Sequence, residues 1–142
     1  MIKVTEIFKA DTTTQQSLPL SLSQIKAGFP SVADDYLDKK LDLNEYLIKH
    51  PSATFFVRVK GDSMTGAGIN SGDILVVDRS LEAKNRSIIV AVVSGEFTVK
   101  RLIKKGDSCQ LVAENANYQA IEVTPAMDFE VWGCVTSVIH HV

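Results

Sequence analysis

The chain has 142 residues, of which 45% are hydrophobic and 23% charged, a composition typical of a globular protein with one main core. Its formal net charge of −2 gives no positive field that would attract nucleic acid. No apolar run approaches the roughly 20 residues needed to cross a bilayer, and the N-terminus lacks the apolar segment of a secretory signal. We therefore expect a cytoplasmic protein that is not inserted in a membrane.

The first part of the chain is polar and weakly patterned. This composition predicts an N-terminal arm over residues 1–50 and a core domain over residues 51–142. Residues 11–17 contain no apolar side chain, which is typical of a mobile segment. Leu18-Pro19-Leu20 is expected to be extended, because a proline disfavours helix at the residue before it.

Two short helices are predicted within this arm. The better-marked helix starts from Asp42, which can cap the first turn, and places Leu43, Tyr46 and Leu47 on one face. Pro51 ends it. A more weakly marked helix covers residues 33–39.

After Pro51, short apolar runs alternate with turn signals, which favours strands. A long glycine-containing connection, residues 61–72, follows the first strand, and Ser94-Gly95-Glu96 predicts a tight hairpin turn. The expected strands cover residues 55–59, 74–77, 87–93, 97–102, 110–113, 120–123 and 129–139. Short, frequent strands with little helix between them indicate a mostly β fold with a curled antiparallel sheet.

Cysteine and histidine chemistry is excluded first. Cys109 and Cys134 have no metal-like spacing and are expected to be buried apolar side chains in a reducing compartment. His50 precedes a proline at an expected helix end, where capping is the ordinary role. His140 and His141 lie at the C-terminus, where chains fray. A Ser-His-Asp triad and a zinc site are therefore improbable, and we expect no metal and no cofactor.

Ser63 and Lys100 form the remaining candidate pair. Serine needs a base to become a nucleophile, and a lysine can serve if desolvation keeps it neutral. Lys100 stands in the middle of an apolar strand, and Ser63 follows a strand end in a glycine-flanked turn that could offer amides to an oxyanion. From these residues alone the ordinary interpretations stay open: a solvated strand lysine, and a serine bonded to its own backbone.

The strings around both residues resemble one family. Val59–Leu81 (VKGDSMTGAGINSGDILVVDRSL) and Gly95–Leu102 (GEFTVKRL) resemble, in order, spacing and flanks, the UmuD proteins, which are LexA-like self-cleaving serine peptidases. The resemblance runs from about Leu18 to the end of the chain. It includes the further segments Ala27–Tyr36, Leu41–Val59, Glu114–Tyr118 and Val131–His140.

The resemblance implies roles for four residues. Ser63 matches the nucleophile and Lys100 the general base, and Ala27–Gly28 matches the bond that such proteins cut in themselves. It also implies the LexA-like peptidase fold behind an extended, partly disordered N-terminal arm. The turn Lys84-Asn85-Arg86-Ser87 departs from the family's usual His-Gly-Asp-like turn, without touching these four residues.

The same resemblance implies a cellular context. UmuD-like proteins are cut when the RecA filament on single-stranded DNA is present during the SOS response. Their shortened homodimer joins a UmuC-type Y-family polymerase in error-prone translesion synthesis.

Three other functions can be weighed against the sequence. A LexA-type repressor would carry a helix-turn-helix domain in front of the core, and the first 50 residues show no three-helix pattern or basic patch, so no sequence-specific DNA binding is expected. A membrane signal peptidase would need an anchor. A binding module with an inactive Ser63–Lys100 pair would carry the same strings.

Overall fold

The structure, a computed structural model, describes residues 2–15, 17–20 and 39–142. It divides into two compact units. The larger unit contains the described residues up to Ala10 together with His50–Val142, and the smaller contains the described part of Asp11–Lys49. No helix among the described residues is long and apolar enough to cross a membrane.

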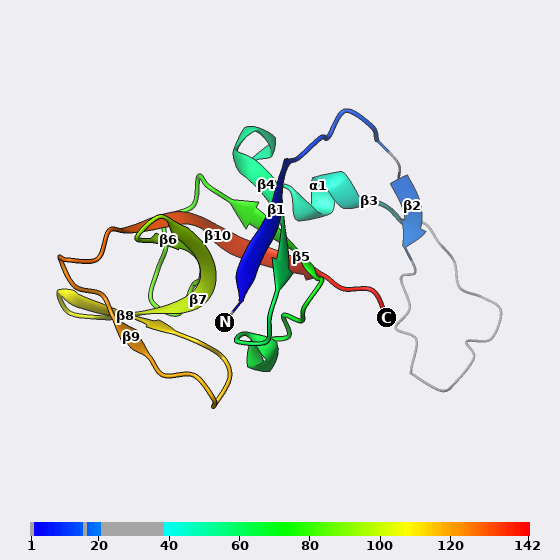
Figure 1. The fold of residues 1–142 in the computed structure, drawn as a ribbon. Coiled ribbons are helices and arrows are strands. Elements are labelled where there is room, and N and C mark those ends of the chain that lie inside the picture. Colours follow the sequence, from blue (N-terminus) through cyan, green and yellow to red (C-terminus); the bar gives the residue numbers. More distant parts are fainter. Residues whose placement is uncertain (1, 16, 21–38) are drawn as a thin grey trace. The chain divides into compact units, whose positions relative to one another are not determined.

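The larger unit is built on one antiparallel sheet of eight strands, in the order β1-β4-β5-β10-β6-β7-β8-β9 (Figure 1). This architecture confirms the mostly β, antiparallel fold expected from the sequence. The strands are β1 (Lys3–Lys9), β4 (Thr54–Lys60), β5 (Ile74–Asp78), β6 (Ile88–Val93), β7 (Glu96–Lys105), β8 (Ser108–Val112), β9 (Ile121–Glu122) and β10 (Phe129–Ile139).

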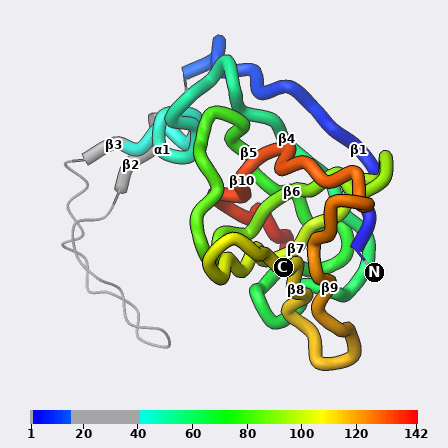
Figure 2. The backbone as a smooth tube through the Cα atoms, turned by 90° about the vertical axis from the view of Figure 1, so that its left-hand side faces the viewer, coloured from blue at the N-terminus to red at the C-terminus, as the bar shows by residue number. Residues whose placement is uncertain are grey.

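The sheet is strongly curled. β1 is its edge strand and β7 lies far along the strand order, yet the Thr98 hydroxyl on β7 donates to the carbonyl of Ile2, just before β1, at 3.3 Å. The two views of the chain show β1 and β7 coming together at the same end of this unit (Figures 1 and 2). Curling therefore brings the start of the chain to the strand that carries Lys100.

The hairpin between β6 and β7 forms as expected. Ser94 and Gly95 have φ angles of 50° and 82°, and a two-residue turn with both central residues at positive φ matches the right-handed twist of its strands. The resulting ladder pairs Ile89 with Lys100, which fixes the lysine on an interior strand of the sheet, between β6 and β8.

β1 is a strand that the sequence analysis does not predict, and β3 (Lys39–Asp42) in the smaller unit is another. β1 pairs antiparallel with β4, from Lys3 opposite Lys60 to Lys9 opposite Phe55. Nearly all of its side chains are exposed, so it lacks the alternation of buried and exposed residues that marks a half-buried strand. Main-chain pairing along the free edge of β4, together with the burial of Ile2, holds it.

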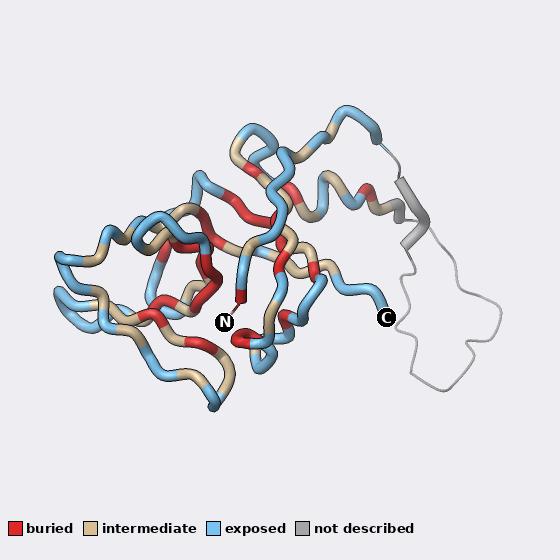
Figure 3. Tube along the Cα trace, viewed as in Figure 1, coloured by how far each residue is buried: buried red, intermediate tan, exposed pale blue. Residues whose placement is uncertain are grey.

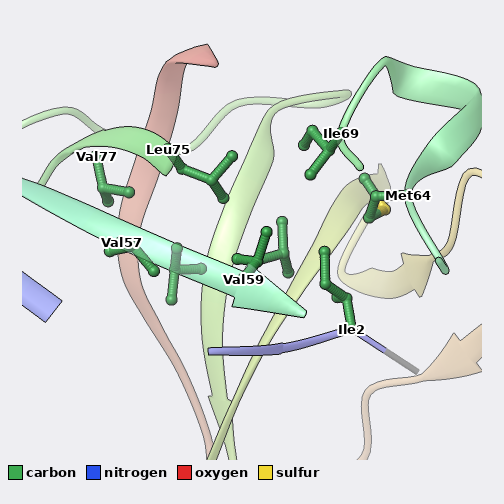
Figure 4. Packing of buried hydrophobic residues seen from close by; sticks show 9 residues of the cluster. Ile2, Val57, Val59, Met64, Ile69, Leu75 and Val77 are labelled. Atoms are coloured by element: carbon green, nitrogen blue, oxygen red, sulfur yellow. The ribbon is translucent and has the colours of Figure 1, made fainter. Parts of the chain in front are cut away.

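The core of the larger unit lies inside the curled sheet (Figure 3). Its main cluster, most of which is labelled in Figure 4, contains Ile2, Val57, Val59, Met64, Ile69, Leu75, Val77, Val90 and Val99. A second cluster contains Ala83, Ile89, Ala91, Leu102, Leu111 and Cys134. Cys134 is buried as expected, whereas Cys109 is only half-buried, and both thiols are free.

In the smaller unit, β2 (Ser17–Leu20) pairs with β3 (Lys39–Asp42), which confirms the extended step around Pro19. α1 (Leu43–Leu47) follows, and the Asp42 carboxylate accepts the Asn44 amide at 3.2 Å as the expected cap. The helix ends at Leu47, before a 3-10 turn, η1 (Pro51–Ala53). Lys39, the last residue of the other predicted helix, lies in β3, so the prediction is wrong at this position. Residues 33–38 of that helix, and the Ala27–Gly28 bond, lie outside the described residues.

Candidate active site

Ser63 lies in a tight turn between β4 and a short 3-10 helix, η2 (Thr65–Ala67). Its side chain is fully buried. The side chain of the next residue, Met64, packs in the main core cluster and so holds the turn against the core. The Ser63 Oγ accepts a hydrogen bond from the Ile2 amide at 3.0 Å. The hydroxyl is therefore held in a defined position in apolar surroundings.

Lys100 lies on β7 with only 2% of its surface exposed. Its strand neighbours Thr98 and Val99 are also buried, so this part of β7 is covered on both faces. Burial lowers the Lys100 pKa, because removing water disfavours the ammonium form. The ordinary interpretation of a strand lysine as a solvated surface charge is thus wrong here, and burial shifts the Lys100 pKa in the direction that a lysine base requires.

Tyr118 connects the serine turn to the lysine strand. Its hydroxyl donates to the Asp62 carboxylate at 2.5 Å, and the Lys100 Nζ atom lies 5.6 Å from its ring centroid. The hydrogen bond to Asp62 raises the Tyr118 pKa. A single side chain therefore contacts Lys100 and Asp62, the residue that directly precedes Ser63.

The loop Glu114–Tyr118 clamps the serine turn at two further points. The Gly66 amide donates to the Glu114 carbonyl at 2.7 Å, and the Asn115 side-chain amide donates to the Asp62 carbonyl at 2.9 Å. Arg101, next to Lys100 on β7, pairs with the Glu114 carboxylate. The loop therefore fixes the serine turn relative to β7.

An open depression lies between this loop and η2. Its lining residues are Thr65, Gly66, Ala113, Glu114, Asn115, Ala116 and Tyr118. Ser63 and Lys100 lie outside this lining, so the depression borders the candidate pair without containing it.

The structure tests only some of the predictions made for the site residues. Ser63 and Lys100 are both buried in the same unit, on elements linked through Ile2 and through Tyr118. Direct proton transfer between Ser63 and Lys100 stays a prediction, and so does cleavage at the Ala27–Gly28 bond. Sequence reasoning missed Ile2, because its contacts with Ser63 and Thr98 are tertiary and no local pattern encodes them.

Two of the three histidines, His50 and His140, pair with carboxylates. His50 contacts Asp78 at 2.5 Å, and the C-cap of α1 is Ile48, so the capping role expected for His50 at the end of this helix is wrong. His140 contacts Asp73 at 2.6 Å. Within residues 2–15, 17–20 and 39–142, no group of three or more His, Cys, Asp or Glu side chains is arranged to hold a metal ion.

Comparison with known proteins places the chain in a family of peptidases. Residues 19–136 match the family model described as Peptidase S24-like. The chain is 45% identical to Protein MucA of Escherichia coli over 96% of this chain and 94% of that protein. It is 43% identical to Protein SamA of Salmonella typhimurium over 89% and 87% of the two chains. It is also 41% identical to the LexA repressor of Shewanella denitrificans, over 80% of this chain and 54% of the repressor.

A curled β domain that buries a serine and a lysine on linked elements, matched over most of its length by a peptidase family model, is in kind a serine peptidase. The chain belongs to the S24-like peptidase family and, with MucA- and SamA-type relatives along nearly its whole length, to its UmuD-type members.

Proposed function

We propose that this protein cleaves its own chain between Ala27 and Gly28, with Ser63 as the nucleophile and Lys100 as the general base. The observation that carries the proposal is the burial of Lys100 on β7, linked through Tyr118 to the turn that carries Ser63. A lysine that is kept neutral supplies the base that serine needs, and the chain offers no histidine at this place.

The reaction proceeds through an acyl-enzyme. Neutral Lys100 takes the proton from the Ser63 hydroxyl as Oγ attacks the carbonyl carbon of Ala27. The tetrahedral intermediate collapses, the bond to the Gly28 nitrogen breaks, and Lys100 returns the proton to that nitrogen. Lys100 then deprotonates a water molecule, which hydrolyses the Ala27 ester and regenerates the serine.

The serine turn also has to stabilise the oxyanion. The amides of Thr65 and Gly66 already donate, to the carbonyls of Asp62 and Glu114. We therefore propose that the backbone amides of Ser63 and Met64 donate hydrogen bonds to the oxyanion. Donors fixed in advance stabilise a developing negative charge strongly, because the site does not reorganise during the reaction.

The proposed role is that of a damage-activated switch in the cytoplasm. From the similarity to MucA and SamA, which supports a UmuD-type role, we propose that this chain is cut during the SOS response and that the RecA filament on single-stranded DNA stimulates the cut. The shortened chain, residues 28–142, would then act as a homodimer with a UmuC-type polymerase in error-prone translesion synthesis. The arm over 1–50 would carry the cleavage site and the core over 51–142 the catalytic residues.

Intact-mass spectrometry of the purified protein, with and without activated RecA filament, tests this proposal. We expect two products that correspond to residues 1–27 and 28–142, formed faster with the filament. Ser63→Ala should stay intact under both conditions. A cut at another bond, or equal cutting of Ser63→Ala, would refute the assignment.

The repressor alternative has its own test. A LexA-type repressor would bind a DNA site with sequence specificity, and binding at low salt would appear as a shifted band. We expect no such shift.

A further inference from the structure

Ile2 occupies the space directly beside the candidate nucleophile. Its amide donates to the Ser63 Oγ at 3.0 Å, and its carbonyl accepts from the Thr98 hydroxyl at 3.3 Å. Its side chain is fully buried, and in Figure 4 it points into the core beside Val59 and Met64. From Lys3 onward the segment runs as β1 along the free edge of β4. Main-chain pairing to a sheet edge combined with a side-chain pocket is the way an extended peptide ligand binds.

This position is incompatible with a bound substrate. A peptide bond about to be attacked lies with its reacting atoms about 3–3.5 Å apart. The Ile2 nitrogen already lies 3.0 Å from the Ser63 Oγ. Two peptide segments cannot occupy that space, so the Ala27 carbonyl can reach Ser63 only after Ile2 has moved.

We propose that the N-terminal segment Ile2–Lys9 is a built-in competitor of the cleavage segment, bound in the peptide groove of Ser63 and displaced before each cut. This inference rests on the autocleavage proposed above and adds a regulatory step to it. The groove binds an extended peptide along β4, with an apolar side chain inserted beside Met64. In the intact chain, Ile2–Lys9 fills it.

The segment is built to be released. β1 pairs only with β4 among the sheet strands, its register shifts between Val4 and Glu6, and most of its side chains are exposed. Lys3 stands directly opposite Lys60, next to Ile2. Like charges at directly opposed positions weaken a strand pair. Edge elements with few buried contacts open locally at low free energy.

Cleavage would make the release permanent. A cut between Ala27 and Gly28 removes residues 1–27, which include all of β1. The remaining chain would keep Ser63 and Lys100 but lose the strand that covers the edge of β4 and the side chain that fills the pocket. The groove would then be open to another extended segment.

A reversible lock tests the inference without disturbing the core. Lys3→Cys and Lys60→Cys replace two exposed side chains at directly opposed positions, where the Cα separation of an antiparallel pair suits a disulfide. In the full-length double variant, oxidation should slow cleavage at Ala27–Gly28 about tenfold or more, because the tether keeps the competitor at high local concentration. Reduction should restore the rate, and Lys60→Cys alone should not respond. Equal cleavage of the oxidised and reduced forms would overturn the inference.

A second measurement does not depend on cleavage. In Ser63→Cys, alkylation of the introduced thiol by iodoacetamide, mapped by peptide mass spectrometry, reports access to the groove. Ile2→Asp should speed alkylation, whereas Ile7→Asp, at an exposed position of the same strand, should leave it near the Ser63→Cys rate. Equal rates for Ile2→Asp and Ile7→Asp would contradict the inference. Faster alkylation with Ile2→Asp in a protein that never cuts Ala27–Gly28 would support the competitor and refute the proposed function.

Discussion

At the scale of single residues, the buried Lys100 is the most consequential side chain of the molecule. A lysine normally extends its ammonium into water, and here only 2% of the residue is exposed. Its pKa in the folded state is lowered by desolvation. Between the folded and the unfolded pKa of Lys100, the unfolded chain binds more protons than the folded chain, so the free energy of unfolding rises with pH across that window. Below the window the folded state bears the full cost of burying the charged amine.

Lys100→Met should therefore have opposite effects on cleavage and on thermal stability. The variant should lose autocleavage and unfold at a higher temperature than the wild type at neutral pH, because an apolar side chain of similar length removes the cost of burying the amine. The gain should shrink as pH rises toward the usual lysine pKa. Thermal unfolding followed by circular dichroism across pH checks this, and a lower unfolding temperature at neutral pH would contradict it.

The Asp78 carboxylate stabilises the folded state, whereas the buried Lys100 costs stability, although folding lowers the pKa of both groups. Burial raises the Asp78 pKa, but hydrogen bonds from Ser80 and the contact with His50 outweigh burial and leave the pKa lowered. The stability that this carboxylate contributes is present above its unfolded pKa and is lost as pH falls through the folded value.

Ser80→Ala removes the hydroxyl that donates to Asp78 at 2.6 Å. It should lower the free energy of unfolding near neutral pH by about 1–2 kcal/mol and move the acid-unfolding midpoint to higher pH. Ser108→Ala removes an exposed hydroxyl bond to the neutral Lys105 carbonyl and serves as the control. Equal acid midpoints for the two variants would be evidence against the role of Ser80.

At the scale of elements, the close approach of η2 to the loop Glu114–Tyr118 positions the serine turn. Gly66 lies at the contact, where an added Cβ would be 2.6 Å from the Glu114 carbonyl oxygen, a backbone atom. Since backbone on both sides of the contact is held by hydrogen bonds, a side chain there forces the serine turn and the loop apart.

Gly66→Ala should slow cleavage about 100-fold, the order of loss that follows from displacing a nucleophile by about 1 Å. Gly68→Asn is the matched control, because Gly68 has a φ of 79° with open space around its Cβ and asparagine tolerates that conformation. Gel-based cleavage time courses measure both variants. Cleavage of Gly66→Ala at the rate of Gly68→Asn would refute the positioning role.

The helices and strands differ in how well their sequences predict them. The hairpin around Ser94 and Gly95 follows from local turn chemistry, and the helix after Asp42 follows from its cap, so both were predictable. β1 was not, because an edge strand held by main-chain bonds has no buried face to leave a pattern. For the site, Ser63 and Lys100 were indicated by the resemblance of their flanking strings, whereas the Tyr118 bridge depends on a tertiary contact that no local pattern encodes.

At the scale of the whole molecule, the curl of the sheet links the start of the chain to the strand that carries Lys100. Ile2 contacts both Ser63 and Thr98, residues that are distant in sequence and come together only because the sheet closes on itself. Proteolytic loss of the first 27 residues would therefore change the larger unit as well as the arm.

Cleavage should consequently loosen one edge of the sheet and leave its centre unchanged. In the processed chain, amides of β4 that pair with β1 should exchange hydrogen faster than in the intact Ser63→Ala protein, because their partners are gone. Amides of β10, in the middle of the sheet between β5 and β6, should keep their protection. Hydrogen–deuterium exchange with peptide mass readout compares the two, and unchanged β4 protection would contradict the expectation.

The pH profile of autocleavage, followed by intact mass, is the sharpest test of the proposed Ser63–Lys100 chemistry. If neutral Lys100 activates Ser63, the rate of cutting at Ala27–Gly28 rises with pH through one ionisation below the usual lysine value. Ser63→Ala and Lys100→Met then stay uncut at every pH, with losses of about 10⁴-fold or more. A rate independent of pH, or cutting of Ser63→Ala at the wild-type rate, would contradict this mechanism.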